Sequence, residues 1–222
     1  MTRKLGQNLF EMLSAGDLRG VIKICDKYAN LSGMMHFFDN LMRPIMYEIG
    51  QLWAEKKLDI ATEHVCVNTA NALIRIINER QLKSVGRHHN RRKVFICTPN
   101  GEQHNLACNI IESTLFSKGY EVYSASPSLP ADAVIYSLNN IMPDAILISV
   151  TLEDNIQIAK SLVRKIRTGF TSLPIFVGGL AFNGTNKISG FDTINNTIVI
   201  RNVALIDAIK IIRSKIMTTS YA

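Results

Sequence analysis

The pattern of apolar positions changes once along the chain, near residue 90. Up to that point apolar residues recur at helical spacing, with no strand-like alternation, which predicts a small helical bundle. Turn-forming residues and candidate N-caps divide this half into four expected helices: Leu5 to Ser14, Asp17 to Ala29, residues 33–55, and Asp59 to Leu82.

One continuous apolar stripe marks the third expected helix. It consists of Met42, Ile45, Met46, Ile49 and Trp53, at offsets of 3, 4, 7 and 11 from the first. Pro44 should bend this helix or start part of it. The stripe predicts core packing, although soft methionine side chains would also suit a wall that faces a bulky ligand.

After residue 93, short apolar strands alternate with helical stretches, which indicates an α/β domain with a parallel sheet. The expected strands are 94–97, 121–124, 145–149, 175–177 and 197–200, and the expected helices are 103–118, 131–140, 156–168, a short one at 182–188, and 204–217. Ligands of such sheets bind beyond the carboxyl ends of the strands. We therefore expect the ligand-binding residues in the loops after Cys97, Ser149 and Val177.

Composition narrows the class of protein. No apolar run reaches the roughly 18 residues of a membrane span, and the N-terminus does not have the pattern of a secretory signal, so we expect a cytoplasmic protein. The four cysteines form no C-x-x-C pair, which argues against a zinc cluster or a disulfide framework. Net charge is +7, and Arg, His and Lys gather at 87–93, either as a solvated linker or as a contact for nucleic acid or a protein partner.

The first strand-end loop carries a carboxylate and an imidazole, Glu102 and His104. A carboxylate that hydrogen-bonds one ring nitrogen fixes the tautomer and makes the other nitrogen more basic, as is usual for metal-ligating histidines. The triplet E-x-H is common. From this loop alone, His104 is either a metal ligand or a loop histidine with no specific function.

The other two loops carry hydroxyls and glycines. Ser149, Thr151 and Leu152 follow the third expected strand, and Gly178 and Gly179 follow the fourth. Adjacent glycines let a ligand approach the backbone, but a tight turn without a ligand would use the same pair. A phospho-acceptor receiver domain needs an Asp where Ser149 stands, so that class is disfavoured.

Together these features resemble the cobalamin-binding domain of the methionine synthase type, whose motif is D-x-H-x-x-G, S-x-L and GG. The offsets agree, with 45 residues from His104 to Ser149 and 29 more to Gly178. The resemblance implies that His104 ligates cobalt in place of the cofactor's own base and that Glu102 tunes it. It also implies that Ser149 contacts the lower base, with the glycines making room for the nucleotide tail. Glu102 replaces Asp, Ala107 replaces Gly, and Thr151 shifts the leucine to Leu152, so either of the last two could line the pocket.

The helical half resembles the cap of cobalamin-dependent light-sensing regulators, in which the segment reads W-x9-E-H. Here Trp53 is followed after nine residues by Glu63 and His64. The resemblance implies that these three side chains cover the upper axial ligand. The alternatives are that Trp53 is a core residue and that Glu63 only makes a favourable electrostatic interaction with the helix dipole.

From these features we expect a four-helix bundle cap at 1–85, a basic linker at 86–92, and a flavodoxin-like (Rossmann-type) five-stranded parallel α/β domain at 93–222. The resemblance implies a cobalamin-binding, non-enzymatic photoreceptor or transcription regulator that uses adenosylcobalamin, or alternatively methylcobalamin. Light-sensing regulators of this kind place a helix-turn-helix domain ahead of the cap. Because this sequence begins with the cap, we expect output through self-association or a protein partner, without direct nucleic-acid or membrane binding. The alternative function is a corrinoid carrier of a methyltransferase system.

Overall fold

Two units with separate hydrophobic cores make up the chain, which is described by a computed structural model at residues 2–84, 92–183, 190–191 and 193–218. The units are Met1–Gly86 and Arg87–Ala222. Residues 85–91, which hold most of the expected basic linker, lie outside the described part. No helix among the described residues is both long enough and apolar enough to cross a bilayer.

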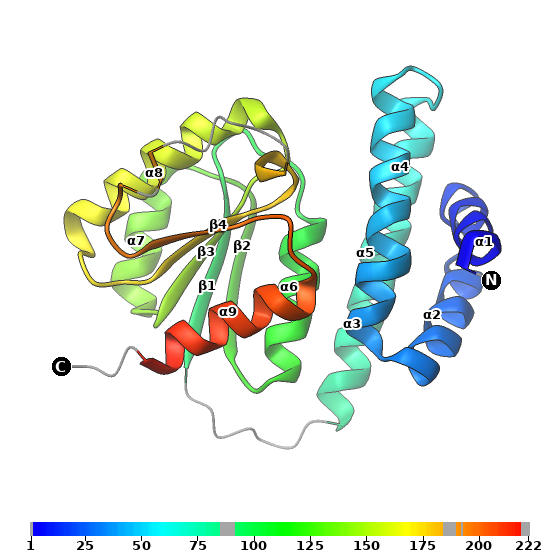
Figure 1. The fold of residues 1–222 in the computed structure, drawn as a ribbon, viewed down its shortest axis with the longest axis horizontal. Helices are drawn as coiled ribbons and strands as arrows, with labels where there is room; N and C mark the ends of the chain where they lie inside the picture. Colours follow the sequence, from blue (N-terminus) through cyan, green and yellow to red (C-terminus); the bar gives the residue numbers. More distant parts are fainter. Residues whose placement is uncertain (1, 85–91, 184–189, 192, 219–222) are drawn as a thin grey trace. The chain divides into compact units, whose positions relative to one another are not determined.

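The first unit is helical. Its elements are α1 (Thr2–Ser14), α2 (Leu18–Ser32), α3 (Met34–Phe37), the π-helical turn η1 (Phe38–Met42), α4 (Arg43–Ala54) and α5 (Ile60–Ser84) (Figure 1). Asp17 caps α2, because its Oδ1 accepts the Gly20 N–H at 2.9 Å, and Asp59 accepts the Thr62 N–H at the start of α5. Both caps agree with the sequence-based expectation.

The third expected helix is a continuous helical run with one widened turn. Proline has no N–H to donate to the carbonyl four residues earlier, and the π-helical turn η1 ends at Met42, two positions before Pro44. The wider turn is how the helix accommodates Pro44. Along the predicted stripe Met42, Ile45 and Ile49 are buried, whereas the last member, Trp53, is 43% exposed.

The second unit is a three-layer α/β/α domain. Its elements are β1 (Lys93–Pro99), α6 (Leu106–Ser117), β2 (Glu121–Leu129), α7 (Ala131–Ile141), β3 (Ala145–Ser149), η2 (Glu153–Asn155), α8 (Ile156–Gly169), β4 (Ile175–Gly178), η3 (Leu180–Phe182), β5 (Thr197–Ile200) and α9 (Leu205–Thr218). All pairings are parallel, in the order β2-β1-β3-β4-β5, as in flavodoxin-like domains.

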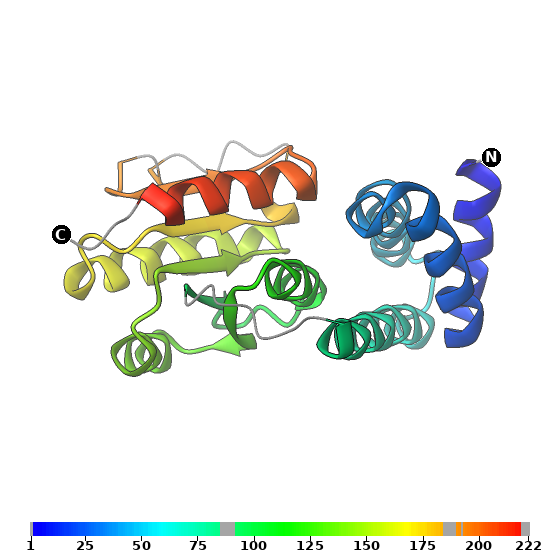
Figure 2. The same cartoon turned by 90° about the horizontal axis from the view of Figure 1, so that it is seen from below.

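Strand residues alternate between two cores. Phe95 and Ile146 face a core with α7 and α8, and Val94 and Leu147 face a second core with α6 and α9 (Figures 1 and 2). Both faces of the sheet are covered, which explains why the inner strands β1, β3 and β4 are mainly apolar and show no alternation of apolar with polar residues. The expected α/β fold and its five strands are confirmed.

One expected helix differs from the structure at its start. The helix expected from Gln103 starts at Leu106, because the His104 N–H donates to the Glu102 side chain and residues 102–105 stay non-helical. The short helix expected at 182–188 falls mostly on residues 184–189, which lie outside the described part; before them, Phe182 ends the 3-10 turn η3. The Phe182 and Phe191 rings pack edge to face, with centroids 5.6 Å apart, and close this end of the core.

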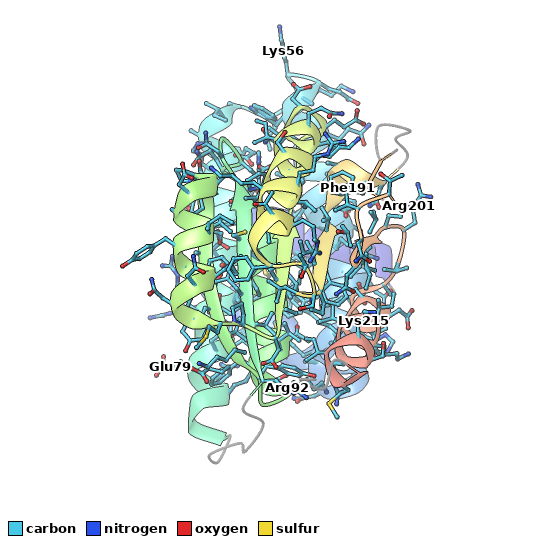
Figure 3. The ribbon with its side chains drawn as sticks, turned by 90° about the vertical axis from the view of Figure 1, so that its left-hand side faces the viewer. Lys56, Glu79, Arg92, Phe191, Arg201 and Lys215 are labelled. Atoms are coloured by element: carbon cyan, nitrogen blue, oxygen red, sulfur yellow. The ribbon has the colours of Figure 1, made fainter. Side chains whose placement is uncertain are left out.

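The amino end of β1 is anchored away from the strand-end loops. Arg92, marked in Figure 3, makes an ion pair of 2.7 Å with Asp144, whose other oxygen accepts the Lys93 N–H. These contacts fix where the sheet begins. The loops that contain the candidate site lie at the opposite edge of the sheet, where β1, β3 and β4 end.

Candidate functional site

A buried carboxylate holds the candidate ligand His104. The side chain of Glu102 is fully buried, whereas that of His104 is 43% exposed. Glu102 Oε1 lies 2.6 Å from His104 Nδ1 and accepts the His104 backbone N–H at 3.1 Å. The carboxylate therefore fixes both the ring and the backbone of the histidine.

The second oxygen of the same carboxylate binds the loop after β3. Glu102 Oε2 accepts the backbone N–H groups of Thr151 and Leu152 at 2.9 and 3.0 Å and the side-chain amide of Asn155 at 3.0 Å. Because β1 pairs directly with β3, these loops meet at the point where strand order reverses, and this is where doubly wound domains bind ligands. The structure thus brings four predicted residues together: Glu102, His104, Thr151 and Leu152.

The charge state of Glu102 determines the tautomer of His104. Burial by itself raises the pKa of the carboxyl, but hydrogen bonds from His104, Asn155, Leu152 and Thr151 outweigh it and lower the pKa from 4.5 to about 2. An ionised carboxylate only accepts hydrogen bonds, so His104 Nδ1 carries the proton. In this tautomer the lone pair of Nε2 is the one that can bind a metal.

The loop before Glu102 is held by further hydroxyls. Thr98 is fully buried, and its hydroxyl donates to the Glu102 carbonyl at 3.2 Å and accepts the Ser128 N–H at 2.7 Å. Ser128 Oγ in turn accepts the Gly101 N–H at 2.9 Å. These contacts set the direction in which Glu102 and His104 leave the sheet.

Ser149 offers a buried hydroxyl at the end of β3. Its Oγ is buried and makes no hydrogen bond to the described residues within ordinary limits of distance and angle, although it lies beside the Cys108 thiol. Burial raises the pKa of that thiol to about 11, against weak opposing contacts from Ser126 and Ser149, so the thiol is neutral. Buried polar atoms in proteins are nearly always satisfied, which suits this hydroxyl to a ligand's polar atom.

The glycine pair lies next to Ser149. Ser149 pairs with Gly178 in the sheet register, and Gly179 has a φ of +123°. A Cβ on Gly179 would lie 2.2 Å from the Val150 carbonyl oxygen, so the protein's own backbone requires a glycine at this position. At Gly178 a Cβ would lie 3.0 Å from the Ile200 carbonyl oxygen. The role of the pair toward a nucleotide tail stays a prediction.

The three predicted cap residues lie at one end of the α4 and α5 pair in the first unit. Trp53 belongs to the last turn of α4, the turn after it contains Lys56 (Figure 3), and Glu63 and His64 belong to the start of α5. Glu63 Oε2 lies 2.6 Å from His64 Nδ1, with side-chain exposures of 15% and 66%. Trp53 is exposed, so the interpretation of this residue as core is wrong.

Asn155 is the site residue that sequence reasoning missed. It is 8% exposed and follows Ser149 by six positions, just before α8. In sequence it looks like an ordinary helix-start residue, and only the tertiary contact with Glu102 reveals its use. The described residues contain no group of three or more His, Cys, Asp or Glu side chains that could hold a metal ion. A metal held by a macrocycle needs only an axial ligand from the protein, as haem iron does.

Taken together, the structure defines a flavodoxin-like domain with a carboxylate-oriented histidine at its ligand-binding edge, accompanied by a helical domain. Two family models match this arrangement, both described as a B12 binding domain: one covers residues 5–78 and the other residues 92–194. The chain therefore belongs to the B12-binding family, and these matches support a cobalamin cofactor.

Two curated relatives from Myxococcus xanthus are similar in sequence. The HTH-type transcriptional repressor CarH is 22% identical over 176 residues, covering 79% of this chain and 57% of CarH. The HTH-type transcriptional repressor CarA is 23% identical over 169 residues, covering 75% of this chain and 56% of CarA. The chain thus spans little more than half the length of these relatives.

Solved corrinoid proteins share the fold. The Methanosarcina barkeri monomethylamine corrinoid protein superposes with a TM-score of 0.74 at 12% identity, covering 96% of this chain and 99% of that one. The methanol:cobalamin methyltransferase complex MtaBC from the same organism gives 0.51 at 16% identity, covering 98% and 81%. At these identities the likeness concerns the fold alone.

Proposed function

We propose that this protein is a cobalamin-binding sensor in which His104 is the lower axial ligand of cobalt and the cofactor's own base is displaced. The observation that carries the proposal is the Glu102 carboxylate, which holds His104 at 2.6 Å in the tautomer that leaves the Nε2 lone pair for a metal. A buried hydroxyl, Ser149 Oγ, lies at the same edge of the sheet and makes no hydrogen bond to the described residues within ordinary limits of distance and angle. This donor set fits a corrinoid.

Each residue at this edge has a role in the proposal. His104 would ligate cobalt, Glu102 would orient the ring and raise its basicity, and Ser149 would contact the displaced lower base. Thr151 and Leu152 would line the pocket, with their N–H groups fixed by Glu102. Gly178 and Gly179 would leave the nucleotide tail room next to the backbone.

The cap residues favour a sensor over a carrier. Trp53 exposes a large apolar surface, and the Glu63 and His64 side chains form a hydrogen-bonded pair at the same end of the α4 and α5 hairpin. We propose that these three side chains contact a bulky upper ligand, that of adenosylcobalamin. A methyl group is too small to need such a surface.

The proposed signal is a change in what these cap side chains touch. When bound, adenosylcobalamin would supply a light-sensitive cobalt–carbon bond. Trp53, Glu63 and His64 would contact the upper group while it is present, and a cap without these contacts would favour a different arrangement. The expected output is self-association or docking to a protein partner. The similarity to CarH and CarA, both named as transcriptional repressors, supports a regulatory role.

The absorption spectrum of the full chain with adenosylcobalamin tests the ligation. It is recorded in the dark and after green light for wild type, His104→Ala and His36→Ala. His36 is an exposed histidine of the helical unit that pairs with Asn40, which makes it a matched control. We expect His104→Ala to lose the histidine-ligated spectrum and His36→Ala to keep it. An unchanged spectrum and affinity in His104→Ala would refute the ligation.

The second candidate function is a corrinoid carrier for a methyltransferase, supported by the fold shared with the monomethylamine corrinoid protein and MtaBC. Size-exclusion chromatography before and after illumination distinguishes the two functions. A light-dependent change in elution supports the sensor. An unchanged elution, together with methyl transfer from the methylcobalamin-loaded protein to an acceptor, supports the carrier.

A further inference from the structure

A pocket of about 350 Å³ lies on the α/β domain, away from the proposed cobalamin site. It is lined by the end of α8 and the segment before β5: Arg164, Arg167, Thr168, Thr193, Ile194 and Asn195. The strands are parallel, so the starts of β4 and β5 lie at the edge of the sheet opposite the loop of His104. Small-molecule sites have volumes of about 300–1,000 Å³. The pocket is therefore large enough for a second ligand, separate from the cofactor.

The charge of this pocket is positive and has no acidic partner among the described residues. α8 contains four basic residues and no acidic one. Lys165 pairs with Asp132, but Arg164 is exposed and makes no hydrogen bond or ion pair with a described residue. Within the described part of the chain, Arg167 donates only to backbone carbonyls, and its buried Nε has no acceptor. Burial without a negative partner lowers the pKa of this guanidinium, so an anion nearby would be stabilising.

The uncharged groups of the pocket suit a ligand that carries hydroxyls. The Thr168 hydroxyl donates to the Lys165 carbonyl at 2.8 Å, and the Thr193 hydroxyl donates to the Gly190 carbonyl at 3.1 Å. Because both protons are used within the protein, each oxygen offers a ligand only its lone pairs. A sugar hydroxyl can donate to them, whereas the ionised oxygens of a phosphate cannot. The Asn195 side-chain amide makes no hydrogen bond with a described residue and can both donate and accept.

We propose that this pocket binds a small sugar phosphate, either free or as the ribose phosphate of a mononucleotide. Arg164 has no partner to give up and binds the phosphate through its guanidinium, whose fork of N–H donors matches two phosphate oxygens. Arg167 lies one turn further along α8 and contributes its charge while it keeps its carbonyl contacts. The sugar hydroxyls donate to Thr168 and Thr193. This inference does not depend on the function proposed for His104.

Isothermal titration calorimetry of the full chain tests the proposal, with the chain saturated with methylcobalamin in the dark so that the cofactor cannot be replaced by the probe. The probes are ribose 5-phosphate, adenosine monophosphate, inorganic phosphate and ribose. Arg164→Leu removes the guanidinium, and Arg164→Lys keeps the charge without the fork. Arg213→Leu on α9 is the matched control, because Arg213 is also exposed and makes no hydrogen bond or ion pair with a described residue. Backbone ¹⁵N NMR of the cofactor-free chain locates the bound ribose 5-phosphate.

We expect ribose 5-phosphate to bind more tightly than inorganic phosphate or ribose, and to shift the amide signals of Thr168, Thr193 and Asn195. Arg164→Leu should weaken its binding about tenfold, as for the loss of a hydrogen bond to a charged group. Arg164→Lys should fall between, and Arg213→Leu should match wild type.

The adenosine monophosphate arm distinguishes the two sources of the sugar phosphate. Tighter binding than that of ribose 5-phosphate assigns the pocket to a mononucleotide, and equal or weaker binding assigns it to a free sugar phosphate. Three results would overturn the proposal: equal Kd values for ribose 5-phosphate and inorganic phosphate, equal losses in Arg164→Leu and Arg213→Leu, or no amide shift at the pocket.

Discussion

Glu102→Gln should destabilise the α/β domain through the five hydrogen bonds that the carboxylate accepts. One pKa unit corresponds to about 1.4 kcal/mol, so the lowering of the Glu102 pKa from 4.5 to about 2 represents about 3 kcal/mol in favour of the ionised form. Glutamine offers one oxygen and one NH₂ group. In either orientation of the glutamine amide, its NH₂ group would face N–H groups that donate to the carboxylate in the wild type.

The effect must depend on pH in a defined direction. Since the folded-state pKa of Glu102 is lowered, its stabilisation is fully present above about pH 4.5 and is lost as the pH falls through about 2. The free-energy difference between wild type and Glu102→Gln should therefore be about 3 kcal/mol at pH 7 and shrink steadily below pH 4.5.

Urea unfolding followed by circular dichroism at pH 7, 5, 4 and 3 measures this difference, and amide hydrogen exchange in β1 and β3 reports the α/β unit separately. Glu112→Gln is the matched control. Burial raises the pKa of Glu112, against a weaker opposing bond from Ser124, so its ionised form is not favoured by folding and glutamine should cost nothing at pH 7. Equal stability of Glu102→Gln and wild type at pH 7, or a difference that does not vary with pH, would refute the reasoning.

Two further substitutions test packing around the site and the sheet. Gly179→Ala should destabilise the α/β domain by about 2 kcal/mol or more, because the new methyl group would lie 2.2 Å from the Val150 carbonyl oxygen; a thermal melt within 1 °C of wild type would contradict this. Arg167→Leu should cost about 2–4 kcal/mol in urea unfolding, since the Arg167 guanidinium donates to four backbone carbonyls around the starts of β4 and β5. Arg164→Leu, on an exposed face of the same helix, should change stability by less than about 0.5 kcal/mol, and equal losses for the two arginines would disprove the role of Arg167.

Most of the α/β fold could be predicted because its signals are local. Runs such as 145–148 are apolar throughout, and turn formers flank the strands, so the strand bounds observed at β3 and β5 match the expected ones. The start of α6 could not be predicted, because the Glu102 side chain, two residues before His104, accepts the His104 N–H. Helical periodicity carries no information about such a competing acceptor.

The exposure of Trp53 shows the same limit in the cap. Its offset from Met42 places it on the apolar stripe of the expected third helix, and the sequence cannot tell where the core stops covering that stripe. The structure leaves the ring 43% exposed at the last turn of α4. This exposure supports the ligand-facing role proposed for Trp53.

Glu102 and His104 are two residues apart in one loop, so a contact between their side chains could be predicted from the sequence. The contacts of the same carboxylate with Thr151, Leu152 and Asn155 could be recognised only in the folded domain. Those contacts span 49 to 53 residues and depend on the parallel register of β1 with β3. Glu102 and His104 are close along the chain, whatever the fold. Glu102 Oε2 gains its hydrogen-bond donors from the loop after β3 only when the sheet forms and brings that loop next to β1.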